Sequence, residues 1–179
     1  MKKILAILLF ICSFLGFSFA EKEVKVYSKS MKKDIPVTVI LPDGYSKDKS
    51  YNTIYVLHGW SGSNKNYPEK TSIKKLSDQY DIIYVSPDGN YDSWYVDSNL
   101  KKESKYYTFV SKELVDYIDS NFSTYKAKEH RAITGLSMGG FGAFYIGIKN
   151  QDVFGNIGSM SGGMNPEQYK GNWGIEKVI

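Results

Sequence analysis

The sequence has few of the side chains that build metal centres and disulfide bonds. Its 179 residues include one cysteine, Cys12, and two histidines, His58 and His130. Two separated histidines and a single thiol cannot form a closed zinc site, and one thiol cannot form an intrachain disulfide. The glycine-rich stretch in the second half of the chain also lacks the Gly-Lys-Ser or Gly-Lys-Thr of a phosphate-binding loop. We therefore predict no metal and no other cofactor.

An excess of one sign of charge is also missing. The chain has 23 Lys and Arg residues against 19 Asp and Glu, and two of the lysines lie in the first twenty residues, which contain no acid. This near balance gives no reason to expect a nucleic-acid or membrane partner for the rest of the chain. The 42% hydrophobic content, without internal repeats or low-complexity linkers, predicts one folded domain with a core.

The longest apolar run lies at the N-terminus. A basic start precedes apolar residues 4–17, and Ser-Phe-Ala, ending at Ala20, supplies the small residues that a signal peptidase requires. We predict a signal peptide over residues 1–20 and a secreted or periplasmic product, residues 21–179. A membrane anchor is the alternative, although the run is short for a bilayer span. Cys12 lies inside this leader, so the mature domain has no thiol.

After the leader, apolar runs typical of strands alternate with amphipathic segments typical of helices. The expected strands cover 24–26, 35–41, 51–57, 81–85, 131–135 and 156–161, and the expected helices cover 68–80, 107–122 and the segment after Ser137. Because each crossover helix must pass over one face of a sheet, the alternation predicts an α/β fold with a mostly parallel sheet and helices on both faces. Ligands of such sheets bind beyond the carboxyl ends of the strands.

The motif that points most directly to a catalytic residue is Gly-x-Ser-x-Gly at 135–139, between a predicted strand and a predicted helix. A serine lifted out of a sheet edge needs a sharp turn, and Gly135 and Gly139 lack the Cβ atoms that would obstruct it. The amide of Met138 would lie in the first helical turn without an internal partner, where it can stabilise an oxyanion. We interpret Ser137 as a nucleophile. An ordinary glycine-rich loop is the alternative.

A nucleophilic serine needs a base, and neither histidine is well placed to be one. His130 precedes the strand that leads to Ser137, so we expect it at the far end of that strand, roughly 20 Å away at about 3.3 Å per residue. His58 follows a strand on the correct edge of the sheet. We expect it to support, with Gly59, the loop whose Trp60 amide becomes a second oxyanion donor, and a role as the base is the alternative.

The residues after Ser137 do not supply the full set of catalytic groups that a nucleophilic serine requires. When a serine on such a turn is the nucleophile, the acid and the histidine follow it in chain order. After Ser137 the sequence has no histidine, and its only acids are Asp152, Glu167 and Glu176. We infer that this polypeptide lacks the C-terminal strands that would carry both groups.

A long predicted loop at 90–103 follows another strand end and contains Trp94 and Tyr95. Loops of this length in compact domains are more often functional than idle. The two rings could line the substrate site by stacking on a sugar or an aromatic acid. Alternatively, they pack the loop against the sheet.

Several of these segments together resemble a known family, the esterase D family of α/β-hydrolases. The resemblance is carried by LHGWSG at 57–62, SPDG at 86–89, SWYVDS at 93–98, EHRAITGLSMGG at 129–140 and GSMSGG at 158–163. The family includes S-formylglutathione hydrolases, secreted feruloyl and acetyl xylan esterases, and mycolyltransferases, and the sequence looks most like the bacterial feruloyl esterase branch.

The resemblance implies roles for particular residues. It makes Ser137 the nucleophile, places the oxyanion hole at the amides of Met138 and Trp60, and leaves His130 without a catalytic role. The sequence departs from the family at Asn99, where relatives often have proline, and in lacking the segment with the acid and a Gly-x-His motif.

The hypothesis from the sequence is a secreted serine carboxylic-ester hydrolase. Its expected substrates are acetyl or feruloyl esters of plant polysaccharides, and export argues against a cytosolic glutathione thioester. The competing hypothesis is a non-catalytic fragment or binding module of the same fold that lacks the triad acid and histidine.

Overall fold

The computed structural model describes residues 21–179, so the predicted signal peptide at 1–20 lies outside the described residues. The strands are β1 (Glu21–Ser28), β2 (Lys33–Ile40), β3 (Asn52–Leu57), β4 (Ile82–Pro87), β5 (Arg131–Gly135) and β6 (Asn156–Ile157). The α-helices are α1 (Asn66–Lys70), α2 (Ile73–Tyr80), α3 (Tyr106–Thr108), α4 (Leu114–Asn121) and α5 (Met138–Lys149). A π-helical segment, Phe109–Glu113, joins α3 to α4, and 3₁₀ turns lie at Lys128–His130, Pro166–Tyr169 and Ile175–Lys177.

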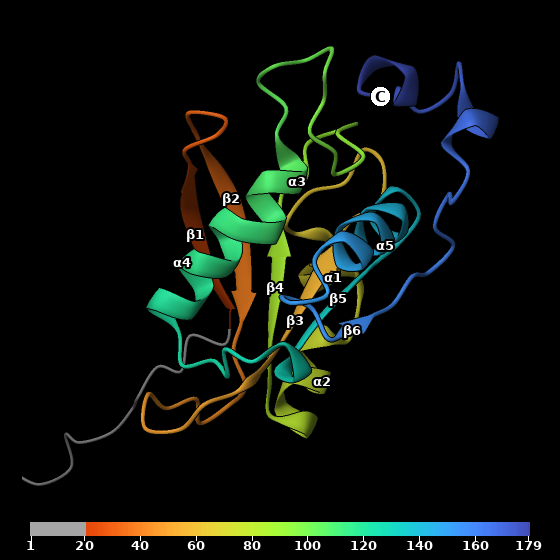
Figure 1. Cartoon of the computed structure of the whole chain (residues 1–179). Coiled ribbons are helices and arrows are strands. Elements are labelled where there is room, and N and C mark those ends of the chain that lie inside the picture. Colours follow the sequence, from red (N-terminus) through yellow and green to blue (C-terminus); the bar gives the residue numbers. More distant parts are fainter. Residues whose placement is uncertain (1–20) are drawn as a thin grey trace, which may run out of the picture.

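The strands form one sheet in the order β1-β2-β4-β3-β5-β6. β1 pairs antiparallel with β2, and β2 pairs antiparallel with β4, whereas β3, β4, β5 and β6 run parallel to one another. The mostly parallel α/β architecture predicted from the alternation of strands and helices is therefore confirmed. Because β3 and β5 are adjacent and parallel, the segments that follow their last residues emerge at the same edge of the sheet (Figure 1).

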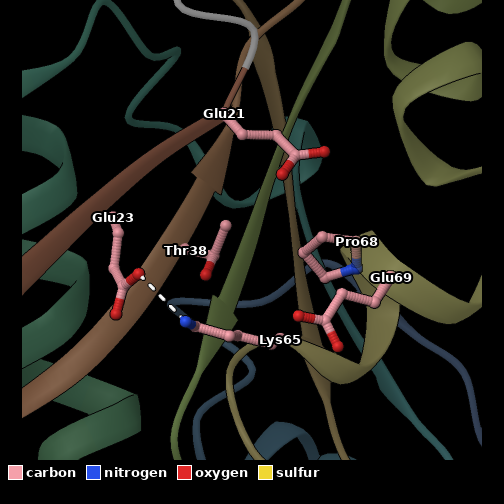
Figure 2. A pocket seen from close by; sticks show the side chains of 6 residues that line it. All are labelled: Glu21, Glu23, Thr38, Lys65, Pro68 and Glu69. Atoms are coloured by element: carbon pink, nitrogen blue, oxygen red, sulfur yellow. Dashed lines mark ion pairs between the residues drawn. The ribbon is translucent and has the colours of Figure 1, made fainter.

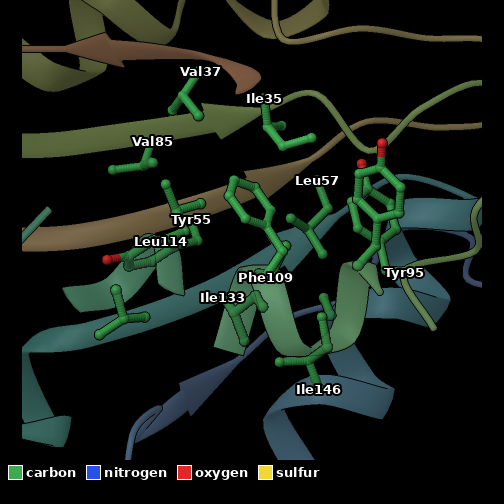
Figure 3. Packing of buried hydrophobic residues seen from close by; sticks show 14 of the residues in the cluster. Ile35, Val37, Tyr55, Leu57, Val85, Tyr95, Phe109, Leu114, Ile133 and Ile146 are labelled. Carbon is green, nitrogen blue, oxygen red and sulfur yellow. The ribbon is translucent and has the colours of Figure 1, made fainter. Parts of the chain in front are cut away.

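Apolar side chains cover the two faces of the sheet unequally. The larger cluster joins the segment from α3 to α4 and helix α5 to the strands, and Figure 3 shows Phe109, Leu114 and Ile146 against Val85 and Ile133. A smaller cluster on α2 packs Ile73 against Val56 and Tyr84. Burial of apolar surface on both faces supplies the main driving force for this fold. It also fixes the position of α5, the helix that begins directly after Ser137.

Two predicted elements differ from the observed ones. The helix expected over 68–80 is divided, because Thr71, the residue after α1, is extended (φ −136°, ψ 169°). Its side-chain oxygen accepts the amide of Ile73, the first residue of α2, at 3.2 Å. In α2, Ile73 is buried whereas Leu76 is 40% exposed. The strand expected over 156–161 is shorter, although an isolated bridge between Leu136 and Met160 continues its pairing.

Candidate active site

Ser137 lies at a sharp backbone corner between β5 and α5. Its φ of 54° and ψ of −115° place it in a region that costs a residue with a side chain about 1–3 kcal/mol. The corner is held from both sides, since the Ser137 amide donates to the Met160 carbonyl at 2.9 Å and the Phe141 amide donates to the Ser137 carbonyl at 2.9 Å. The residue is exposed. The structure thus presents the hydroxyl-bearing residue at the surface, on a strained turn.

Two glycines make this corner possible. A Cβ added to Gly139 would collide with the Leu57 carbonyl oxygen, and one added to Gly135 would collide with the backbone of Gly139. Strands β3 and β5 and the start of α5 therefore approach too closely for any side chain at either position. This is the requirement that the Gly-x-Ser-x-Gly spacing predicted.

The loop at 58–62 follows β3 and runs beside Ser137. A Cβ built on Gly59 would lie 3.7 Å from the Ser137 Cβ. Within residues 21–179, the amides of Trp60 and Met138 have no hydrogen-bond acceptor, whereas the Ser61 amide donates to the Tyr91 carbonyl at 2.8 Å. Two unpaired donors that flank one serine can stabilise negative charge on an oxygen bound between them.

His58 braces this loop from inside. Its side chain is buried, Nδ1 lies 2.7 Å from the Gly59 carbonyl oxygen, and Nε2 accepts the Gly89 amide at 2.8 Å. A neutral ring with its hydrogen on Nδ1 satisfies both contacts. Because both nitrogens are used within the protein, His58 supports the loop and has no free nitrogen for a proton from Ser137.

Replacing His58 with alanine is expected to lower the free energy of unfolding by about 2 kcal/mol, because the Gly89 amide would lose its acceptor in a buried setting. Urea denaturation measures the change. His130→Ala is the matched control, since that ring lies at the surface, and a change of about 0.5 kcal/mol or less is expected. Equal losses in the two variants would contradict the bracing role.

His130 lies at the other end of β5, as predicted. It ends the 3₁₀ turn just before Arg131, and its Nδ1 lies 2.7 Å from Oδ1 of Asn52, the first residue of β3. Its ring stacks on Tyr125 with the centroids 4.4 Å apart. Within residues 21–179, then, neither histidine is placed to take the proton of Ser137.

Asp88 is the charged group next to the His58 junction. One carboxylate oxygen lies 3.9 Å from His58 Nε2 and accepts the Asn90 amide at 2.6 Å. Burial opposes ionisation, but the Asn90 amide, which donates to this carboxylate, helps to hold the pKa of Asp88 below its ordinary value. Asp88 is therefore a carboxylate at neutral pH and shapes the turn after β4.

Trp94 and Tyr95 do not line an open surface in this structure, being only 3% and 0% exposed. The Trp94 indole donates to the Trp173 carbonyl at 3.0 Å, and its ring faces Phe141 and Tyr169. In this structure the two rings pack the 90–103 loop against other parts of the chain, and their contact with substrate stays a prediction. No periodic sequence pattern signals this, because it depends on tertiary contacts with residues far along the chain.

Two cavities in the described residues lie apart from the serine. One, of about 410 Å³, lies beside α5 and the 90–103 loop and is lined by Val96, Asp97, Asn99, Phe141, Tyr145, Pro166, Val178 and Ile179. Figure 2 shows another, of about 240 Å³, at the β1–β2 side of the sheet, lined by Glu21, Glu23, Thr38, Lys65, Pro68 and Glu69. In it Lys65 pairs with Glu23 at 3.6 Å. Neither lining includes Ser137 or Trp60.

Over residues 21–179, no group of three or more His, Cys, Asp or Glu side chains is arranged to hold a metal ion. Over the same span, no helix has both the length and the apolar character that crossing a bilayer requires.

The parallel sheet, with a serine at the corner between β5 and α5, defines an α/β-hydrolase fold, and solved α/β-hydrolase esterases share it. The sequence places the chain more narrowly. Residues 28–177 match the sequence profile of the Esterase family, described as "Putative esterase", and the chain belongs to that family.

Individual relatives agree with this assignment. The acetyl esterase of Caldicellulosiruptor saccharolyticus is 32% identical over 147 residues, which cover 78% of this chain and 54% of that protein. A solved ferulic acid esterase is 31% identical with a TM-score of 0.73, covering 83% of this chain and 63% of that one. FphF, a fluorophosphonate-binding serine hydrolase of Staphylococcus aureus, is 26% identical with a TM-score of 0.69, covering 75% and 54%. The chain thus spans about half the length of the acetyl esterase.

Proposed function

We propose that this protein is a serine carboxylic-ester hydrolase that acts by acyl transfer to Ser137. The observation that carries the proposal is the exposed serine on a strained corner beside two unpaired amides, those of Trp60 and Met138. Strain and unpaired donors both cost stability, and they occur together where a reaction uses them.

The chemistry would follow the acyl-enzyme route. Ser137 Oγ attacks the ester carbonyl, its proton passes to a base, and the amides of Trp60 and Met138 stabilise the tetrahedral oxyanion. Collapse expels the alcohol, which takes up the proton, and water then hydrolyses the acyl-serine. Since neither histidine of this chain fits the role of base, the proposal includes a histidine from the part of the relatives' fold that this chain does not cover.

For the substrate, we propose acetyl or feruloyl esters of plant polysaccharides. The names of two relatives, an acetyl esterase and a ferulic acid esterase, support these acyl groups. The esterase D branch, with its secreted feruloyl esterases, is the finer assignment that the sequence motifs favour. The N-terminal twenty residues support a secreted or periplasmic location. N-terminal sequencing of the exported protein would test that location, with Glu21 as the expected first residue.

A second candidate is a binding module that keeps the fold without turnover. It is favoured by the engagement of both His58 ring nitrogens within the protein and by the position of His130 at the far end of β5. One experiment separates the two: the protein is treated with a fluorophosphonate, digested and analysed by mass spectrometry, and hydrolysis of 4-nitrophenyl acetate is measured in parallel. The hydrolase proposal expects an adduct on Ser137, with weak turnover for this length of chain. Absence of that adduct, with no turnover above the reagent blank, would reject it.

A further inference from the structure

Tyr95 occupies a buried position between two parts of the candidate site. Its ring fills space left by two glycines: a Cβ on Gly89 would collide with the ring, and a Cβ on Gly142 would lie 2.7 Å from the Tyr95 Cβ. Gly89 follows β4 and donates its amide to His58, whereas Gly142 lies on α5, little more than one turn after Ser137. The Tyr95 side chain therefore lies between Gly89 and Gly142 and contacts both residues.

The hydroxyl of Tyr95 reaches the root of the 58–62 loop. It donates to the His58 carbonyl oxygen at 3.2 Å, and its ring meets the His58 ring edge-on with the centroids 5.8 Å apart. A Cβ built on the next residue, Gly59, would lie 3.7 Å from the Ser137 Cβ, so this part of the loop is next to the serine. Tyr95 is thus joined to the loop that carries the Trp60 amide by a directional bond as well as by packing. Burial raises the pKa of the Tyr95 phenol well above its ordinary value, so the group remains a donor.

The backbone at Trp94 and Tyr95 is also strained. Trp94 and Tyr95 have φ values of 51° and 56°, so two consecutive large residues adopt the left-handed conformation. The Ser93 hydroxyl stabilises the turn by accepting the Tyr95 amide at 3.1 Å and donating to the Gly89 carbonyl. Such strain persists only where the surrounding structure enforces it, and here it turns the Tyr95 ring inward.

We propose that Tyr95 is a positioning residue, which fixes the 58–62 loop against the helix that begins after Ser137. This inference rests on the proposed function, because the distance it controls is that between the Trp60 amide and the serine. The ring sets the separation of the two elements, and the hydroxyl sets the orientation of the His58 carbonyl, hence that of the next peptide group. Tyr95 need not touch the substrate.

Tyr95→Phe tests the inference, because it keeps the ring and removes the hydrogen bond. We expect the rate of fluorophosphonate labelling at Ser137 to fall about 10- to 100-fold, the loss that a misplaced reacting group causes. Exchange of the Ser61 and Gly62 amides, followed by NMR, should accelerate about tenfold, because both are hydrogen-bonded within or beside this loop. The melting temperature should fall by only about 2–4 °C, the effect of losing one buried hydrogen bond, and exchange in β3 and β5 should stay as in the parent.

Tyr55→Phe is the matched control. Tyr55 is also fully buried, but its hydroxyl has no hydrogen-bond partner in the described residues, and its ring meets Phe154 on the far side of β5. This variant should leave the labelling rate and loop exchange unchanged. If Tyr95→Phe also leaves both unchanged, or if it accelerates exchange throughout the sheet, the positioning role is overturned. If the parent protein is not labelled, the proposed function fails, and the exchange rates still decide the role of Tyr95.

Discussion

Replacing Ser137 with alanine is expected to reduce fluorophosphonate labelling to background and to reduce any ester hydrolysis by this chain to the reagent blank. The reason is that the attacking oxygen is removed while the corner, the Trp60 amide and the Met138 amide stay in place. Intact-mass spectrometry gives the labelled fraction, and 4-nitrophenyl acetate gives the hydrolysis rate. Ser120→Ala, which removes an exposed hydroxyl on α4, is the control and should be labelled as the parent is.

A second substitution at residue 137 tests whether the backbone corner is strained. Ser137→Gly removes the Cβ from a residue at φ 54°, so we expect the free energy of unfolding to rise by about 1 kcal/mol while labelling is lost. Urea denaturation measures the difference between the glycine and alanine variants. A glycine variant less stable than the alanine one would contradict the strained geometry, and labelling that persists in either would place the nucleophile elsewhere.

Replacing Gly139 with alanine is expected to cost about 3 kcal/mol or more, and to abolish labelling as well. The added Cβ would meet the Leu57 carbonyl oxygen and lie 2.6 Å from the His58 carbonyl oxygen. Backbone atoms cannot rotate aside as a flexible side chain can, so α5 must move away from β3. That movement separates Met138 from the 58–62 loop and so moves the Met138 and Trp60 amides apart.

Gly44→Ala is the comparison for this variant. Gly44 has nothing within 4 Å of the added Cβ, so its substitution costs only the strain of φ +73°, about 1 kcal/mol. Thermal or urea unfolding should therefore rank the parent above Gly44→Ala and Gly44→Ala above Gly139→Ala. Equal stabilities of the two variants would mean that the close approach of α5 to β3 does not exist in solution.

Local patterns predicted the fold and the serine corner well. The continuous apolar run ending at Leu57 and the strand ending at Gly135 were placed correctly, since a buried parallel strand has few alternatives. The glycines around Ser137 were informative because their spacing indicates positions where a side chain would not fit. For Gly139, the structure shows that the obstacle is the Leu57 carbonyl. The far position of His130 followed from strand geometry alone.

The surroundings of the 90–103 loop could not be predicted in the same way. Exposed and buried aromatic residues look alike in a sequence, and Trp94 is buried by Tyr169 and Trp173, which follow it by more than seventy residues. Likewise, the division of the 68–80 helix depends on the extended backbone of Thr71 and its hydrogen bond with the Ile73 amide rather than on hydrophobic spacing. In both cases the deciding contact is made by a specific side chain.

The hydrogen bond from the Ser137 amide to Met160 has a consequence for how specificity can change. Met160 supplies only its main-chain oxygen to that bond, while its side chain is 45% exposed, and the neighbouring Leu136 is 48% exposed. Any amino acid at position 160 keeps the carbonyl oxygen that accepts the Ser137 amide and holds the backbone corner. The rim of the site can therefore diversify in size and polarity, by mutation or by design, without disturbing the serine that it surrounds.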